Sequence, residues 1–218
     1  METKIKMNKN KKIIMALFLF LAFFIIQFYS TIENAFAVVS VTDDVIVTLQ
    51  VDEGITITSP LDVTMSPNLG VSSNSSIGSA SWTVKTNGVN GYSLTITSLT
   101  NPALQSGVNS FANYTETVAG TPELWSVPAG SKEFGYSAFG TDTPADWGTG
   151  SSCGSGGIPT ATLKFNGTST ANDPIATRAT VTPTSGIDTT ICFAAEQDTI
   201  YAPSGTYTAT ITATAMTL

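Results

Sequence analysis

Apolar residues recur at every second position through most of this chain, and this period constrains the fold more than any other feature. It is clearest in six runs: 45–51, 79–84, 92–97, 161–165, 189–195 and 205–215. A period of two is typical of a strand with one buried face, whereas a helix repeats every 3.6 residues. Pro, Gly, Asn and Asp separate the runs, as turns require. The pattern predicts an all-β protein, a single Greek-key or jelly-roll-like β-sandwich of about 8–11 strands.

The clearest expected hairpin runs from residue 79 to residue 97. Trp82 and Val84 share a face of its first strand, and 87–91 (Asn-Gly-Val-Asn-Gly) supplies residues that tolerate positive φ. We expect these aromatic and aliphatic side chains to pack in the core. The middle, 98–160, is less regular, and we expect long loops there with one or two strands, one of them at 134–138.

The N-terminus has the organisation of a secretory signal peptide. Five lysines in the first twelve residues precede an uncharged apolar run from Ile13 to about Tyr29, and Ala35 and Ala37 occupy the positions that a signal peptidase reads. We therefore predict a signal peptide at 1–37, cleavage before Val38 and a β-sandwich domain at 38–218. The alternative is a retained membrane anchor, since about 17 apolar residues lie near the lower limit for spanning a bilayer.

Charge limits the partners of the exported part. Removing 1–37 takes five of the nine basic residues and two of the sixteen acidic ones, which leaves 4 basic and 14 acidic groups and a net charge near −10. Nucleic acids and anionic lipids are poor partners for such a chain, because binding them relies on clustered Lys and Arg. We expect membrane contact only through the signal segment, if that segment is retained.

The two cysteines, Cys153 and Cys192, both lie in the exported part. A lone pair in an exported chain predicts a disulfide, here closing a loop of about 39 residues, with two free buried thiols as the alternative. Two cysteines without a histidine do not make a structural zinc site, which needs four ligands.

Groups for catalysis are scarce. The chain has no histidine, which removes Ser-His-Asp and Cys-His activation. One Gly-x-Ser-x-Gly match, at 150–154, lies in a Gly/Ser-rich stretch without a following helix, so we interpret it as chance. A carboxylate pair of the glycosidase type stays open on composition. We predict a protein that is not an enzyme and has no cofactor.

Two kinds of ligand site remain as hypotheses in the loops. Oxygen-rich loops can hold calcium, and Asp142, Asp146 and Asp173 lie in expected loops, as do the pairs 43–44 and 52–53. No spacing matches a calcium loop, so solvated surface acids are the favoured interpretation. Aromatic residues of the irregular middle could instead face a ligand, and the candidates are Trp125, Tyr136 and Trp147.

Three segments, 55–60, 91–95 and 205–212, resemble the WxL-type surface domains of Gram-positive bacteria. The last segment also resembles the closing strand of the spore coat protein U family, whose members are secreted pilin-like subunits. These resemblances imply a β-sandwich on the cell surface and, for the WxL type, attachment to the wall. The place of the closing Trp-x-Leu motif is taken here by Ala213-Thr214-Ala215.

The expected function is that of an exported, non-catalytic structural or adhesive protein, secreted or on the bacterial cell surface, whose partners are a wall or other surface polymer or sibling surface proteins. One alternative is a pilus or fibre subunit that assembles by strand complementation, and another is a carbohydrate-binding module. The run Val45–Val51 bears on this choice. We expect the turn Asp52-Glu53-Gly54 to fold it back into its own domain, giving a closed monomer.

Overall fold

The computed structural model describes residues 8–29 and 41–218 and divides the chain into two units, residues 1–49 and 50–218. Helix α1 (Lys9–Tyr29) belongs to the first unit, and its stretch Lys9–Gln27 is long and apolar enough to cross a membrane. This helix is compatible with the expected signal peptide and equally with a retained anchor. The predicted cleavage site, at Ala35, Ala37 and Val38, lies outside the described residues.

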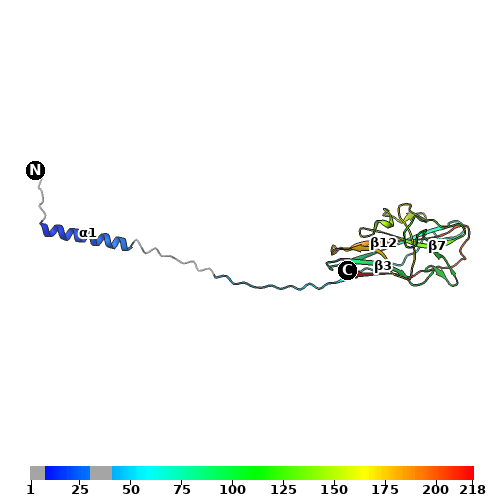
Figure 1. Cartoon of the computed structure of the whole chain (residues 1–218), viewed down its shortest axis with the longest axis horizontal. Helices are drawn as coiled ribbons and strands as arrows, with labels where there is room; N and C mark the ends of the chain where they lie inside the picture. Colours follow the sequence, from blue (N-terminus) through cyan, green and yellow to red (C-terminus); the bar gives the residue numbers. More distant parts are fainter. Residues whose placement is uncertain (1–7, 30–40) are drawn as a thin grey trace. The chain divides into compact units, whose positions relative to one another are not determined.

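Every strand of the described residues lies in the second unit (Figure 1). Six of the thirteen strands are longer than three residues: β2 (Ser75–Thr86), β3 (Tyr92–Ser98), β7 (Lys132–Gly140), β11 (Asp173–Arg178), β12 (Ile187–Gln197) and β13 (Ile211–Thr217). The short ones are β1 (Ile55–Ile57), β4 (Gln105–Ser106), β5 (Asn109–Ser110), β6 (Ala112–Asn113), β8 (Gly154–Ser155), β9 (Ile158–Pro159) and β10 (Asn166–Gly167). The prediction of an all-β protein is confirmed.

Two sheets enclose the main core. The larger has the order β1-β2-β12-β7-β10, with β6 parallel to β7, and the smaller has the order β11-β3-β13. Their inner faces share one cluster of buried side chains, which includes Trp82, Val84, Leu94, Ile96, Phe134, Ile175, Ile191 and Phe193. In β2 and β3 the alternation in the sequence therefore identifies the buried face correctly, and the expectation that Trp82 packs in the core is confirmed.

The expected hairpin of residues 79–97 is wrong. Its two strands, β2 and β3, form as predicted, but they belong to opposite sheets and do not pair with each other. The chain crosses from one sheet to the other at residues 87–91, where Gly91 has φ +81° and its N–H donates to the carbonyl oxygen of Gly88 at 3.0 Å. The two apolar faces thus meet across the core. Alternation fixes the buried face of a strand and says nothing about its neighbour in the sheet.

The expected strand Val45–Val51 is also not formed, and the described residues 41–54 contain no strand. The predicted turn is absent because Asp52 and Gly54 are held to Asn87, just beyond the end of β2. The Asn87 side chain accepts from the Gly54 N–H and donates to the Asp52 carbonyl oxygen, both at 2.7 Å, and the Asn87 N–H donates to the Gly54 carbonyl oxygen at 3.3 Å. These bonds extend the β1–β2 pairing instead of reversing the chain.

Other predicted strands differ at their ends or in length. Residues 161–165 make only isolated bridges, between Gly148 and Leu163 and between Glu123 and Phe165. The closing strand begins at Ile211 and not at residue 205, since before it only a bridge from Thr208 to Gln105 is present. The strand expected at 134–138 is the centre of β7, and the rest of the middle consists of loops and two-residue pairings, as predicted.

Candidate functional site

The three candidate ligand-facing aromatics do not form an exposed row. Tyr136 and Trp147 are buried, with ring centroids 5.2 Å apart. Trp125 is half-buried, stacks on Tyr114 at a centroid distance of 4.7 Å and donates its Nε1–H to Glu196 at 2.7 Å. Their aromatic faces are occupied by protein, so they act in packing. Period-two sequence patterns identify buried rings in regular strands, but the loops of the middle carry no such pattern.

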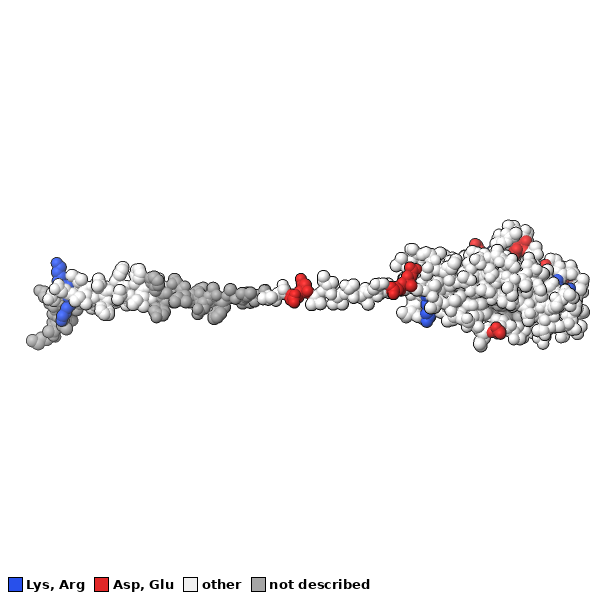
Figure 2. All heavy atoms as spheres, turned by 90° about the horizontal axis from the view of Figure 1, so that it is seen from below, with Lys and Arg blue, Asp and Glu red and all other residues white. Residues whose placement is uncertain are grey.

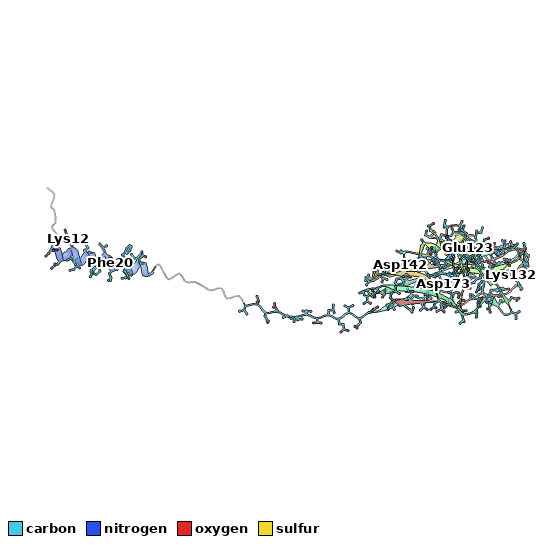
Figure 3. All side chains as sticks on the ribbon, viewed as in Figure 1. Lys12, Phe20, Glu123, Lys132, Asp142 and Asp173 are labelled. Atoms are coloured by element: carbon cyan, nitrogen blue, oxygen red, sulfur yellow. A yellow bond between two sulfur atoms is a disulfide. The ribbon has the colours of Figure 1, made fainter. Side chains whose placement is uncertain are left out.

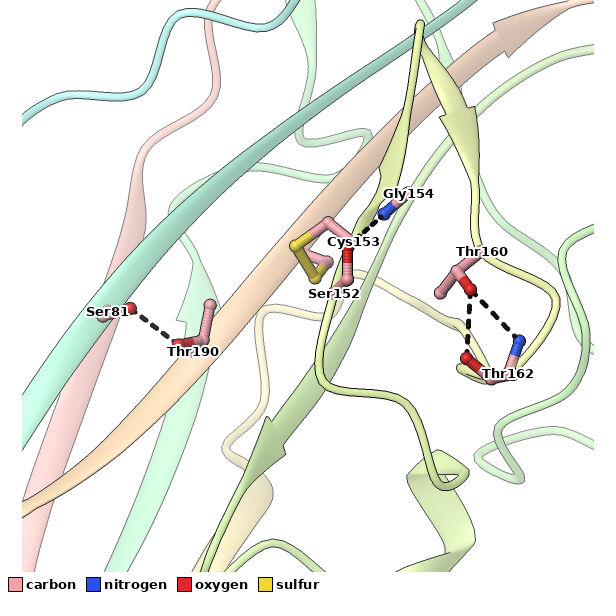
Figure 4. The surroundings of a disulfide bond; sticks show 8 residues. Ser81, Ser152, Cys153, Gly154, Thr160, Thr162 and Thr190 are labelled. Atoms are coloured by element: carbon pink, nitrogen blue, oxygen red, sulfur yellow. Dashed lines mark hydrogen bonds between the residues drawn. A yellow bond between two sulfur atoms is a disulfide. The ribbon is translucent and has the colours of Figure 1, made fainter.

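The predicted disulfide is confirmed and organises the Gly/Ser-rich loop (Figure 4). Cys153 is bonded to Cys192, with 5.3 Å between their Cα atoms. Cys192 is 1% exposed in the middle of β12, where it packs in a second cluster with Leu163 and Phe165. The bridge therefore fastens an outer loop to a central strand. It joins a second tether, the bond from the Ser75 hydroxyl to the Gly157 carbonyl oxygen at 2.7 Å.

The loop acids differ in their surroundings. Asp142 pairs with Arg178 at 3.1 Å and accepts from the Tyr92 hydroxyl at 2.8 Å, and its side chain is 8% exposed. Burial, and then the bond to Asp142, raise the pKa of Tyr92 above its ordinary value. The interpretation as a solvated surface acid is therefore wrong for Asp142. This residue lies in the loop after β7 and connects that loop to β3 through Tyr92 and to β11 through Arg178. Asp146 is exposed in a short 3₁₀ helix (Ala145–Trp147).

The remaining predicted acids divide in the same way. The pairs 43–44 and 52–53 are exposed, as expected. Asp173, labelled in Figure 3, is half-buried. It accepts hydrogen bonds from the Tyr136 hydroxyl and, at 2.9 Å, from the Asn166 side chain. Burial followed by the nearby Asp173 raises the pKa of Tyr136. Among the described residues, no three Asp, Glu, Cys or His side chains are grouped to hold a metal ion.

Asp173 lines an open surface hollow of about 350 Å³. Glu116 lies on its other side and accepts from the Gly167 N–H. Two further oxygens in its wall, Asn166 Oδ1 and Thr168 Oγ1, are buried without a hydrogen-bond partner. Because those two oxygens have almost no accessible surface, the acceptors that the hollow offers are the carboxylates of Glu116 and Asp173, which suit a ligand that presents hydroxyl or amino groups.

Apart from Asp173, no residue of this hollow could be identified from the sequence. Glu116 and Gly167 are 51 positions apart and meet only because β6 and β10 pair one after the other along the same edge of β7, opposite β12. Neither segment carries a periodic pattern, and the Asn-x-Thr sequences at Asn113 and Asn166 do not indicate that the segments meet. The nearby aromatic ring of Tyr114 is buried, and its hydroxyl donates to the Leu124 carbonyl oxygen at 2.9 Å, so it offers no face to a sugar ring.

Comparisons with protein-family models, with curated proteins and with solved structures find no match for this chain.

Proposed function

We propose that the chain is an exported bacterial protein with a structural or adhesive, non-catalytic role on the cell surface or in the surrounding medium. The observation that carries this proposal is the Cys153–Cys192 disulfide, which joins a surface loop to a buried position of β12. Disulfides of this kind form and persist in oxidising compartments outside the cytoplasm. The apolar helix α1, behind a lysine-rich start, supplies the matching export segment.

The surface of the second unit, residues 50–218 and called the β unit below, supports this role. The candidate aromatic rings pack against other side chains, the Gly/Ser-rich loop is tethered, and the hollow at Glu116 and Asp173 is polar and open. Figure 2 shows scattered acidic groups and few basic ones on the visible face, without a continuous basic patch. This supports hydroxyl- or amine-bearing wall polymers and sibling proteins as partners rather than nucleic acid. The resemblance to WxL-type domains stays a prediction.

The carbohydrate-binding alternative is the weaker one. Sugar-binding β-sandwiches of the kind expected from the sequence would stack a ring on exposed aromatic faces. Trp125 stacks on Tyr114, while Tyr136 and Trp147 are buried against each other. Any sugar contact would fall to the polar hollow at Glu116 and Asp173, through hydrogen bonds alone.

Fractionation of the native host into cytoplasm, membrane, wall and medium tests the proposal. We expect the protein in the wall or the medium, with both cysteines resistant to alkylation until a reductant is added. In a second arm, purified protein lacking residues 1–37 is sedimented with isolated cell walls, and Glu116→Gln serves as the hollow variant. A cytoplasmic protein with two free thiols would overturn the proposal.

A further inference from the structure

Residues 45–51 carry a row of aliphatic side chains that are exposed in the described part of the chain. Val45, Ile46, Val47, Leu49 and Val51 are all between 73% and 90% exposed. In an extended chain the odd-numbered positions share one face, which is entirely aliphatic, and the even-numbered face carries Thr48 and Gln50 beside Ile46. Contiguous exposed apolar surface of this kind marks an interaction site in soluble proteins. The segment has the pattern of a half-buried strand and lacks the sheet to which such a strand belongs.

In the β unit, strand β13 has one edge that is not paired with another described strand. This strand ends the smaller sheet, and no described strand pairs with its second edge. An edge strand presents a row of unpaired N–H and C=O groups along that side, ready to accept another strand. The neighbouring rim of the larger sheet is β1, which likewise has β2 on one side only.

The core is also incompletely covered along this rim. Ile211, Ala213 and Ala215 point inward from β13 but are only half-buried, whereas the inward residues Leu94 and Ile96 of the next strand, β3, are fully covered. Across the rim, Ile55 and Val63 are half-buried as well, and all of these residues pack against the main core cluster. A strand placed beside β13, with Val or Leu facing inward, would close the core.

We propose that residues 45–51 of one copy add as a strand to the free edge of β13 in a second copy. The inference rests on the proposed structural role outside the cell and deepens it by naming the partner, which is a sibling copy. Donor and acceptor match in length, since both have seven residues. Their faces match too, because the inward aliphatic row covers the half-buried rim while Thr48 and Gln50 continue the exposed Thr212 and Thr214.

The positions of the donor segment and the acceptor edge determine how the copies assemble. Each copy has one donor segment and one acceptor edge at different places in the sequence, so the contact is heterologous: it extends from copy to copy as an open chain unless the rotation between copies closes a ring or two copies exchange segments. The buried area determines its strength. Four inward side chains remove on the order of 400 Å² of apolar surface from water, well below the burial of a standard stable interface. The assembly is therefore reversible and concentration-dependent, and it is favoured where copies are held close together.

Sedimentation velocity of the protein lacking residues 1–37, from about 1 μM to about 1 mM, tests the proposal. We expect the mean mass to grow with concentration. Val47→Asp, on the inward row, should leave a monomer throughout this range. Ile46→Asp is the matched control, because it places the same charge on an equally exposed aliphatic residue of the opposite face, and it should still assemble. Neither residue belongs to the folded core, so neither change unfolds the β unit.

Cross-linking identifies the acceptor. A copy carrying Val47→Cys is mixed with a larger, tagged copy carrying Ala213→Cys and oxidised mildly, and we expect a disulfide-linked mixed dimer. Ile46→Cys in place of Val47→Cys should not form it. A monomer at every concentration, equal loss of assembly in both Asp variants, or cross-links confined to one chain carrying both cysteines would overturn strand addition. Because purified protein is used, such results leave the export proposal to the fractionation experiment.

Discussion

Removal of the disulfide gives the sharpest energetic prediction. The bridge closes a loop with a sequence separation of 39 residues between Cys153 and Cys192. On the chain-entropy model, releasing a loop of that length lowers the free energy of unfolding by about 4 kcal/mol at 25 °C. The double variant Cys153→Ala/Cys192→Ala should lose this amount. It should also lose up to about 1 kcal/mol more, because the sulfur of Cys192 leaves a small void beside Leu163 and Phe165.

Urea unfolding followed by tryptophan fluorescence measures the change. The unchanged protein is measured with its disulfide intact and after reduction. The reduced protein is the control, because reduction opens the loop without emptying the space at Cys192. We expect the reduced protein to fall between the other two and the m-value to rise in both opened forms, because their unfolded chains are less compact. A loss smaller than about 1 kcal/mol would refute the reasoning, since it would mean that the tethered loop does not restrict the unfolded chain.

Three further changes test the packing and electrostatics of the β unit. Gly91→Ala should cost at least about 2 kcal/mol by urea unfolding, because its φ is +81° and a Cβ there would lie 2.0 Å from the Arg178 carbonyl oxygen; Gly107→Ala, with φ +60° and open space, should cost only about 1 kcal/mol. Trp147→Ala should destabilise by about 3–5 kcal/mol through the cavity it leaves in the core, and a smaller loss than Gly107→Ala would show that the ring is not packed. Burial raises the pKa of Glu133 above its ordinary value of 4.5, against the lowering effect of a backbone hydrogen bond from Thr115. The folded state therefore favours the protonated carboxyl of Glu133. The folded protein keeps its full stability below pH 4.5 and loses part of it as the pH rises through the raised pKa, because the unfolded chain releases this proton first. Glu133→Gln should gain stability relative to the parent between pH 4.5 and 7, and a flat difference across that range would contradict the assignment.

The sequence predicts individual strands well because their apolar period is a local property. The buried faces of β2 and β3 could be read from residues such as Trp82 and Leu94, and both side chains are buried. β12 was expected as a strand, but it is buried on both faces, with Ile191 in the main core and Cys192 in the second cluster. Partner strands could not be read, because β2 and β3 have compatible alternation whether they pair in one sheet or face each other across a core. The same limit applies to Val45–Val51, whose strand period is clear but whose partner is absent from the described residues.

The polar contacts were beyond sequence reasoning for a different reason. Asp142 and Arg178 are 36 positions apart, and their ion pair exists because β11 and the loop after β7 meet beside Tyr92. Glu116 reaches Gly167 in the same way. Such pairs carry no spacing rule, since only the tertiary fold brings their segments together. The cysteines are the exception, because an isolated pair in an exported chain has only one intramolecular partner to choose.

The central claim is that this is an exported, oxidised β protein, and intact-mass measurement of the protein recovered from its native host tests it most directly. Samples are alkylated before and after reduction, so that one spectrum reports both the N-terminus and the thiol state. We predict a chain that begins at Val38, takes up no alkyl group before reduction and takes up two afterwards. A chain that retains residues 13–37 and is alkylated twice without reduction would contradict both the export and the disulfide on which the proposed function rests.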